Sequence, residues 1–441
     1  MLLTNAKIIT NNPERAYIEN GAVLVKDNLI EDFGEKEELE AKYSNDHEVI
    51  DVEGRILMPG MINMHTHIYS SYGRGMIPSQ PTRDFLEILE NQWWKLDKLL
   101  TNEDTRLNAY TTLIESIRNG VTTVFDHHAS PHSVKGSLET LADVAKTLGI
   151  RGDFCYEVSD RDGEKIAEEG IEENIDFIKK YNNDDQDMIH GHFGIHAPFT
   201  ISTKTFEKIR EAMKEVDAGY HIHVAEGIAD QYDSLNKYGK RTVERLFDYD
   251  VLGKKSLIIH AVHASNDELQ ILRDTNTSVI HNPMSNMGNA VGASPVCKML
   301  DMGIEVGLGT DAYTNDMFES VKVAKILQNH ALSDPTRGFG EAYTLQFVNN
   351  PKIASKFFKK ELGIIKKGAY ADLITVDYKN YTPITDKNIA GHIIFGMTGR
   401  MVNDNMVNGK FIMRNREILT ANEDEIFEES KKKTPEIWKN M

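Results

Sequence analysis

Two histidines separated by a single residue, His65 and His67, could hold one metal ion between them. Residues i and i+2 of an extended strand point to the same side, so both imidazoles can reach a single cation. A His-x-His pattern also occurs in many proteins without a metal site, and alone it is weak evidence. The preceding segment 58–64 supplies a turn at Pro59 and Gly60 and then a buried strand that ends at the pair.

Two later residues, His223 and Asp311, could complete this site because each lies at the end of a further predicted strand. Three imidazoles and one carboxylate suit a single zinc or iron(II) ion with one position open to water. We therefore expect one divalent ion, Zn²⁺ with Fe²⁺ as the alternative. His221 competes with His223 because the two share a strand face. Glu226 follows His223 closely and could reach a substrate at the metal, so we favour His223 as the ligand and give His221 a packing or supporting role.

The elements between these residues alternate between strands and helices, which is typical of parallel βα units. One helix is predicted over 101–119, with Thr101 and Asp104 in capping-box positions and Gly120 as its stop. Several predicted strands end at a histidine or just before an aspartate. In a (β/α)8 barrel such strand ends surround one mouth, so the fold class expected is α/β, a TIM-like (β/α)8 barrel. The strands are predicted at 121–125, 193–195, 221–223, 256–260, 278–281 and 305–309.

Both ends of the chain instead show short strands bounded by turn residues. They lie near 22–30 at the start, and at 372–376 and 406–413 near the end, the last with a turn at Asn408 and Gly409. We interpret the two ends as one small β-sandwich domain. The predicted limits are 1–58 for its first part, 59–362 for the metal-dependent barrel, and 363–441 for its second part, which finishes in a surface helix from residue 423.

Composition excludes several classes of function. Fifty Lys and Arg against 68 Asp and Glu leave a formal charge of −18, which disfavours nucleic acid because phosphate binding needs concentrated positive charge. Cys155 and Cys297 are the only cysteines, so a disulfide framework or a cysteine zinc site is not expected, and a reducing cytoplasm fits best. The first ten residues lack a signal-peptide pattern, and no apolar run approaches the roughly 20 residues needed to cross a bilayer. No membrane partner is expected.

Five stretches of the chain together resemble the amidohydrolase superfamily, specifically its cytosine deaminase-like and chlorohydrolase-like branch. Residues 363–377 also resemble that family's closing segment, Gly-x-Ile-x-x-Gly-x-x-Ala-Asp-Leu. Residues 126–131 and 388–397 are similar to the SsnA-type aminohydrolases, a group associated with purine breakdown. The five stretches are 59–67, 196–200, 223–226, 260–263 with 281–286, and 309–311.

The resemblance implies roles for particular residues. The metal ligands would be His65, His67, His223 and Asp311, the general acid Glu226, the partner of the attacking water His260, and one substrate contact His196. Binuclear relatives carry a carbamylated lysine at the end of the fourth strand, and residues 194–196 offer none, which favours a single metal. Ala312 stands where many relatives have glycine. The resemblance also implies a homodimer.

The expected function is that of an aminohydrolase, or deaminase, which uses a metal-activated water to hydrolyse a C–N bond of a small nitrogen heterocycle related to the purines. Asp311 would take the proton of the water, and Glu226 would protonate the ring. The alternative on the same scaffold is a cyclic-amide or C–Cl hydrolase. An alternative of another class, a metal-binding barrel without activity, is disfavoured because the general acid is present. Further candidates for substrate contact lie beyond strand ends, although the tryptophan could instead pack a helix: Arg74, Trp94, His127, His128 and Asn286.

Overall fold

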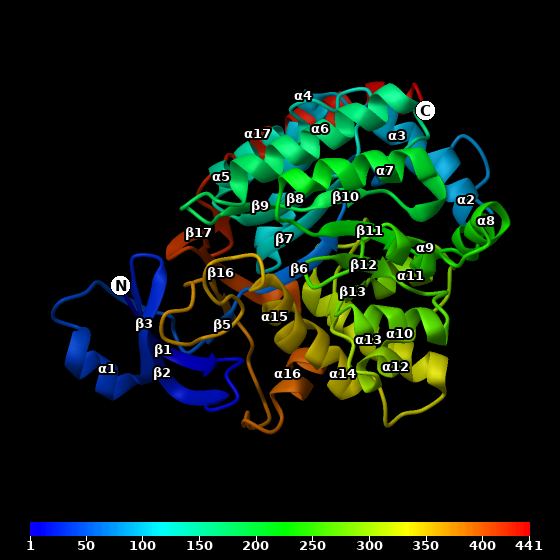
Figure 1. Ribbon diagram of the computed structural model, residues 1–441. Helices are drawn as coiled ribbons and strands as arrows, with labels where there is room; N and C mark the ends of the chain where they lie inside the picture. The colour runs from blue at the N-terminus through cyan, green and yellow to red at the C-terminus, as the bar shows by residue number, and fades with distance from the viewer.

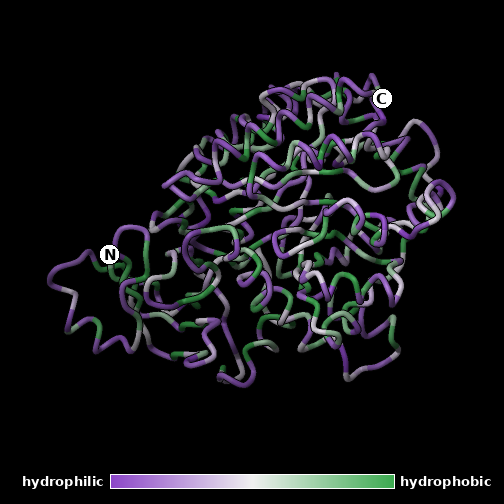
Figure 2. Tube along the Cα trace, viewed as in Figure 1, coloured by the Kyte–Doolittle hydropathy of each residue, from purple (hydrophilic) through white to green (hydrophobic).

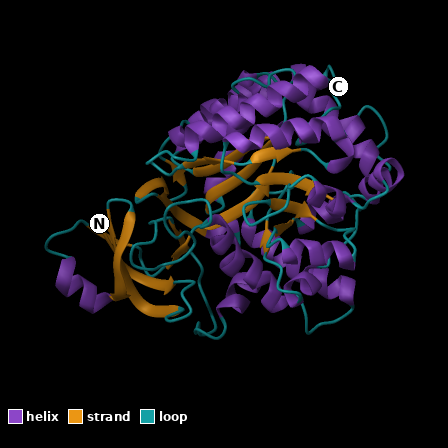
Figure 3. Cartoon of the chain, in the orientation of Figure 1, coloured by secondary structure: helices purple, strands orange, loops and turns teal.

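The centre of the protein is a barrel of eight parallel strands, seen in the computed structural model, which describes residues 1–441 (Figures 1 and 3). A bridge between Thr66 and Asp311 closes the barrel between its first and last strands, and a bridge between Val158 and Ile195 joins its two half-sheets. The fourth strand is broken at His192 into two short pieces, β9 and β10. The strands are β6 (Met61–Thr66), β7 (Val121–His128), β8 (Arg151–Tyr156), β9 (Ile189–Gly191) with β10 (Phe193–Ile195), β11 (Tyr220–Val224), β12 (Leu257–His260), β13 (Ser278–His281) and β14 (Val306–Leu308).

Helices cover the outside of the barrel and carry their apolar faces toward the strands (Figure 2). In α4 (Asn102–Arg118) the predicted capping box is present: the Thr101 hydroxyl accepts a hydrogen bond from the backbone N–H of Asp104, and the Asp104 carboxylate accepts one from Thr101 N. The α/β barrel expected from the sequence is therefore confirmed. The other helices of the layer are α5 (Ser137–Leu148), α6 (Glu164–Tyr181), α7 (Thr203–Ala212), α8 (Ile228–Tyr238), α9 (Thr242–Asp248), α10 (Asn266–Asp274), α11 (Pro283–Gly288), α12 (Val296–Asp301), α13 (Met317–Leu332), α14 (Phe339–Thr344), α15 (Asn350–Ala354) and α16 (Ile389–Gly396).

An irregular segment connects the first strand to α4 and lies over the mouth of the barrel. It contains a 3-10 turn, Ile68–Gly73, then α2 (Phe85–Ile88), a π-helical turn, Leu89–Trp93, and α3 (Trp94–Leu99). The last helix, α17 (Glu423–Trp438), packs on α4 and α3, and the indole N–H of Trp438 donates to the carbonyl of Tyr72 over 2.8 Å. No helix combines the length and the apolar character that crossing a membrane requires.

Both ends of the chain contribute to one nine-stranded sheet beside the barrel, so the small β-rich unit takes strands from each end (Figure 1). Its strand β5 pairs in parallel with β1 and antiparallel with β15, and it leads directly into β6 of the barrel. The predicted turn at Asn408 and Gly409 joins β16 to β17, with positive φ at both residues. The strands are β1 (Leu2–Ile9), β2 (Tyr17–Lys26), β3 (Leu29–Glu35), β4 (Val49–Asp51), β5 (Ile56–Pro59), β15 (Leu373–Val376), β16 (Val402–Val407), β17 (Lys410–Arg414) and β18 (Glu417–Ile418), with α1 (Lys36–Tyr43) between β3 and β4.

One buried ion pair joins the barrel to this sheet. Arg151, the first residue of β8, is fully buried, and its Nε lies 3.0 Å from Oδ2 of Asp372, which precedes β15. Replacing Arg151 with methionine should lower the free energy of unfolding by about 3–5 kcal/mol, because it leaves the Asp372 carboxylate buried without its partner. Urea unfolding followed by circular dichroism measures the change.

The matched control is Lys431→Met on α17, which removes an exposed ion pair with Glu428. That change should stay within about 0.5 kcal/mol of the unaltered protein. Equal losses in the two variants would contradict the structural role of the buried pair.

Candidate active site

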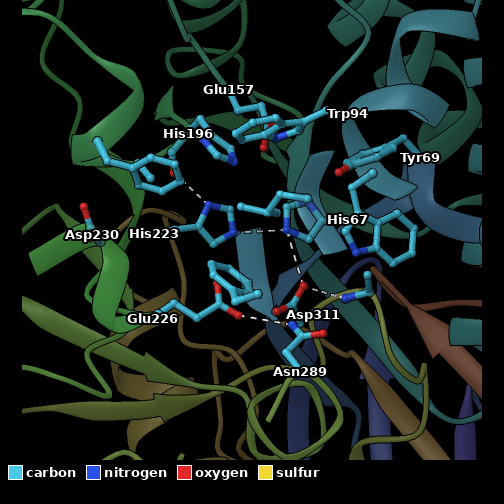
Figure 4. A pocket seen from close by; sticks show the side chains of 17 residues that line it. His67, Tyr69, Trp94, Glu157, His196, His223, Glu226, Asp230, Asn289 and Asp311 are labelled. Atoms are coloured by element: carbon cyan, nitrogen blue, oxygen red, sulfur yellow. Dashed lines mark hydrogen bonds and ion pairs between the residues drawn. The ribbon is translucent and has the colours of Figure 1, made fainter. Parts of the chain in front are cut away.

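The four predicted metal ligands converge at the mouth of the barrel. Figure 4 shows three of them, His67, His223 and Asp311. His65 lies in β6, His67 directly follows that strand, His223 lies in β11, and Asp311 follows β14. Oδ1 of Asp311 lies 3.4 Å from Nε2 of His67 and 3.9 Å from Nε2 of His65. The His67 and His223 rings are stacked, with their Nε2 atoms 3.1 Å apart. All four side chains are buried.

The backbone fixes which ring nitrogens are free to bind a cation. His67 Nδ1 donates to the carbonyl of His127 over 2.6 Å, and His223 Nδ1 donates to the carbonyl of His196 over 2.8 Å. In a neutral imidazole the other nitrogen then carries a lone pair, so the two Nε2 lone pairs face each other. Nε2 of His65 is buried without any hydrogen-bond partner. This set of lone pairs beside a carboxylate fits one divalent cation.

Burial also favours the neutral form of the three histidine rings. It is the main cause that lowers the pKa of His65, His67 and His223 below the ordinary histidine value. The rings therefore stay neutral near pH 7, and a histidine must be neutral to bind a metal ion. His221, the competing candidate, is held differently, because its Nε2 lies 2.9 Å from Nδ1 of His65 and so contacts the back of that ring.

Three residues at this mouth have a strained backbone. Asp311, His260 and Ala225 have φ values of 57°, 75° and 51°, in the left-handed region that residues other than glycine adopt only at a cost of about 1–3 kcal/mol. Gly309 permits the close approach of β14 to β6, since a Cβ atom at that position would lie 2.8 Å from the carbonyl oxygen of His65. The strands are thus held so that Asp311 turns toward the histidines.

A second group of polar side chains lies directly beside the metal cluster. Nε2 of His260 is 3.3 Å from Oε2 of Glu226 and 3.4 Å from Oδ2 of Asp311. The side-chain amide of Asn286 lies 2.8 Å from Nδ1 of His260 and donates to it, which places the ring proton on Nε2, between the two carboxylates. The Ser285 hydroxyl donates to Oδ2 of Asp311 over 2.7 Å.

The pKa values of the two carboxyl groups in this cluster, Glu226 and Asp311, shift in opposite directions. Burial raises the pKa of Glu226 well above its ordinary value, and the nearby Asp311 charge adds to the shift. Burial opposes ionisation of Asp311 as well, but His67, His260 and the Ser285 hydroxyl together hold its pKa below the ordinary value. A proton shared in this cluster therefore resides on Glu226, and Asp311 stays ionised.

A cavity opens over these groups and receives two of the six predicted substrate contacts, His196 and Trp94 (Figure 4). The Trp94 indole N–H is buried and has no acceptor within the protein, and Nδ1 of His196 lies 3.0 Å from the Thr200 hydroxyl. The cavity is lined by His67, Tyr69, Phe85, Leu89, Trp93, Trp94, Glu157, His196, Ala197, Phe199, His223, Glu226, Gly227, Asp230, Asn289, Asp311 and Ala312.

The structure does not bring the other four predicted contacts to this cavity. Arg74 forms an exposed ion pair with Glu115. His127 and His128 are fully buried behind the wall, where Nε2 of His128 lies 2.9 Å from the Ser130 hydroxyl. Asn286 is buried against His260.

Three polar residues that the sequence did not single out also line the cavity, Glu157, Asp230 and Asn289. Asn289 donates to Oε1 of Glu226 over 3.3 Å. Oδ2 of Asp230 accepts from Ala225 N over 2.7 Å, while its Oδ1 is buried without a partner. Glu157 directly follows β8. A carboxylate just beyond the end of a barrel strand is a candidate for the active site, so recognition of β8 in the sequence would have pointed to Glu157.

Comparison with known proteins agrees with this barrel and its cluster of ligands. The chain is 30% identical to a 5'-deoxyadenosine deaminase of Methanosarcina mazei over 444 residues, covering 99% of this chain and 98% of that protein. It is 31% identical to a 5-methylthioadenosine/S-adenosylhomocysteine deaminase of Syntrophomonas wolfei over 432 residues, covering 97% of this chain and 96% of that protein. An adenosine deaminase from Xanthomonas campestris with bound zinc shares the fold, with a TM-score of 0.87 and 21% identity over 100% of this chain and 98% of that one.

The fold and the ligand cluster together define a metal-dependent hydrolase of the (β/α)8 barrel class. Residues 56–412 match the amidohydrolase family, and the chain belongs to that family. The superfamily expected from the sequence motifs is thereby confirmed. The narrower likeness to the SsnA-type aminohydrolases stays a prediction.

Proposed function

We propose that this protein is a metal-dependent aminohydrolase that removes an amino group from a purine-related heterocycle. The observation that carries the proposal is the contact of His260 with both Glu226 and Asp311, within 3.4 Å, beside three facing histidines and at the floor of a cavity. The names of the two relatives that match nearly the whole chain, both deaminases, support the same reaction.

In this proposal His65, His67, His223 and Asp311 hold one divalent ion, with zinc preferred over iron(II). The neutral imidazoles and the single carboxylate suit either ion. When bound, such an ion supplies Lewis-acid activation of water by lowering the pKa of that water from about 16 toward 7. The zinc reported with the Xanthomonas campestris protein supports the preference for zinc.

The residues around the ion divide the proton transfers of a hydrolytic deamination among them. Glu226, whose pKa is raised by burial, donates its proton to a ring nitrogen so that no negative charge builds on the ring. Asp311, which is ionised, accepts a proton from the attacking water, and the Nε2–H of His260 donates to the oxygen of that water. Water adds to the ring carbon, and the C–N bond breaks as the amino group takes the proton held by Asp311 and leaves as ammonia. The remaining hydroxyl proton of the added water returns to Glu226 as the oxo group forms, so the net change is amine plus water to oxo product plus ammonia.

Asn286 acts in this proposal as a positioning residue rather than a substrate contact. Asn286→Leu should lower kcat about 10–100-fold while KM and metal content stay close to those of the unaltered enzyme, because only the tautomer and orientation of His260 are lost. Steady-state kinetics combined with metal analysis measure these quantities. A variant that loses its metal, or one that keeps full kcat, would contradict this role.

The experiment that tests the proposed reaction is a screen for ammonia release. Purified, metal-loaded protein is incubated with purine bases, purine nucleosides, pterins and aminotriazines, and ammonia is measured by a coupled enzymatic assay. We expect release from at least one purine. The alternative function is a cyclic-amide or C–Cl hydrolase, which would use the same residues. Ring opening or chloride release without ammonia would show that this alternative is correct and the proposed deamination is wrong.

We also propose, from the sequence alone, domain limits of 1–58, 59–362 and 363–441. We further propose that the enzyme is a homodimer in the cytoplasm and that it acts on a small molecule. The net charge of −18 supports the absence of a nucleic-acid partner. Light scattering of the purified protein tests the dimer.

A further inference from the structure

Glu157 stands in the cavity wall, and nothing in the deamination chemistry above uses it. It directly follows β8, is 4% exposed, and belongs to the lining of the cavity. Figure 4 shows it on the far side of the His67 and His223 rings from Glu226. The two glutamates therefore face the cavity from opposite sides.

Hydrogen bonding to His127 decides what the free oxygen of Glu157 can do. His127 Nε2 lies 3.0 Å from the backbone carbonyl of His221 and must donate to it, because a carbonyl oxygen has no proton. His127 Nδ1 lies 3.0 Å from Oε2 of Glu157, so a proton lies between these two atoms, whichever of them carries it. In both arrangements the other oxygen, Oε1, has only lone pairs and can act only as an acceptor.

Oε1 of Glu157 has no hydrogen-bond partner within the protein. The nearest cation, Nη2 of Arg161, is 3.9 Å away, beyond hydrogen-bond reach, and it pairs more closely with Asp97. A ring nitrogen of His196 also lies within 4.8 Å of a carboxyl oxygen of Glu157, since Glu157, His196 and His223 form one close group. A ligand that fills the cavity and covers Oε1 must offer it a donor, because an unpaired buried acceptor is destabilising.

The rest of the lining restricts the charge of the ligand. It includes the carboxyl groups of Glu157, Glu226, Asp230 and Asp311 and contains no lysine or arginine. No side chain of the lining could therefore pair with a phosphate or carboxylate group of a ligand, which disfavours nucleotides. An uncharged ring rich in N–H groups is the complementary ligand.

We propose that Glu157 is a specificity-determining residue which accepts a hydrogen bond from the substrate, so that the preferred substrate is an uncharged purine whose six-membered ring carries a second N–H donor besides the amino group that leaves. This inference rests on the proposed deamination. It narrows the purine class to rings such as amino- or oxo-substituted purines that carry an additional amino or lactam N–H.

The test compares pairs of purines that differ by one donor, adenine with 2,6-diaminopurine and 1-methylguanine with guanine.

Two variants of Glu157 separate the effect of hydrogen bonding from the effect of side-chain shape. In Glu157→Gln the amide NH₂ donates to His127 Nδ1 and the carbonyl oxygen still faces the cavity, so the acceptor is kept. Glu157→Leu removes the acceptor, and Glu157→Met is a second apolar variant should the leucine protein fail to fold.

The unaltered enzyme and Glu157→Gln should favour the donor-bearing member of at least one pair by tenfold or more in KM. The apolar variant should lose this preference, with a much smaller change in kcat. Glu164→Leu, at an exposed position on α6, is the matched control and should keep the preference. Absence of preference in the unaltered enzyme, or a preference that survives in the apolar variants, would overturn the assignment.

The same comparison is made by calorimetric binding in a Glu226→Gln background, where turnover does not interfere. This separates the two proposals. If binding shows the donor preference but the unaltered enzyme releases no ammonia, the proposed deamination is wrong and the recognition by Glu157 is retained. If ammonia is released but binding shows no donor preference, the deamination is retained and the recognition by Glu157 is wrong.

Discussion

Replacing Glu226 with glutamine should lower kcat for ammonia release by two to four orders of magnitude and leave about one metal ion per chain. The glutamine has nearly the same shape and can keep the contact with Asn289, but it cannot give a proton to the ring. General acid catalysis contributes about 10²–10⁴-fold, which sets the size of the loss. Rapid-quench or steady-state kinetics and elemental analysis of the same sample measure both quantities.

Glu211→Gln provides the control, because this exposed glutamate of α7 pairs only with Lys214 on the surface. Its activity should match that of the unaltered enzyme. If Glu226→Gln keeps activity within about threefold, Glu226 is not the general acid and the mechanism proposed above is wrong.

Removal of the metal should have an equally large effect. A chelator such as dipicolinate should abolish turnover, and added zinc should restore it. It should also lower the unfolding temperature, since an ion present at 1,000 times its dissociation constant stabilises the folded chain by about 4 kcal/mol. Differential scanning calorimetry before and after dialysis measures this shift.

A pair of alanine variants decides between the two candidate histidines of β11. His223→Ala should bind less than a tenth of an equivalent of zinc, because it removes a lone pair that faces His67. His221→Ala should bind zinc near one equivalent at saturation, with affinity lower by about 10–100-fold, since it removes only the contact behind His65. The opposite pattern would make His221 the ligand and would overturn our preference.

The sequence predicts most of the barrel because its strands carry strong local signals. Apolar runs that stop at a histidine mark β12 and β13, and the capping box marks α4. Strand β8 escaped prediction because Arg151 and Asp153 interrupt its apolar pattern. These two side chains find their partners only in the folded protein, where Arg151 pairs with Asp372 and the Asp153 carboxylate accepts hydrogen bonds from His190 and His192. Sequence alone does not contain these long-range pairings.

The metal site follows from spacing and resemblance, whereas the cavity wall does not. His65 and His67 lie two residues apart at the end of one strand, and His223 and Asp311 lie at or just beyond the ends of others, so barrel geometry already brings them together. Arg74 and Glu157 show the limit of that reasoning. Arg74 lies beyond a strand end but turns to Glu115, and Glu157 enters the cavity from a strand that no local pattern revealed. The direction of a loop side chain depends on partners that are remote in sequence.

The pairing of β5 with β15 bears on how the chain folds. Leu57 lies opposite Thr375, although 317 residues separate them along the chain. A loop of that length is slow to close, and during synthesis β15 leaves the ribosome only after the barrel strands. We expect amide hydrogens of β5 to become protected late in refolding, after those of β11 to β13. His65 and His67 would then acquire their final positions near the end of the process, so the ability to bind zinc should be one of the last properties that a refolding chain recovers.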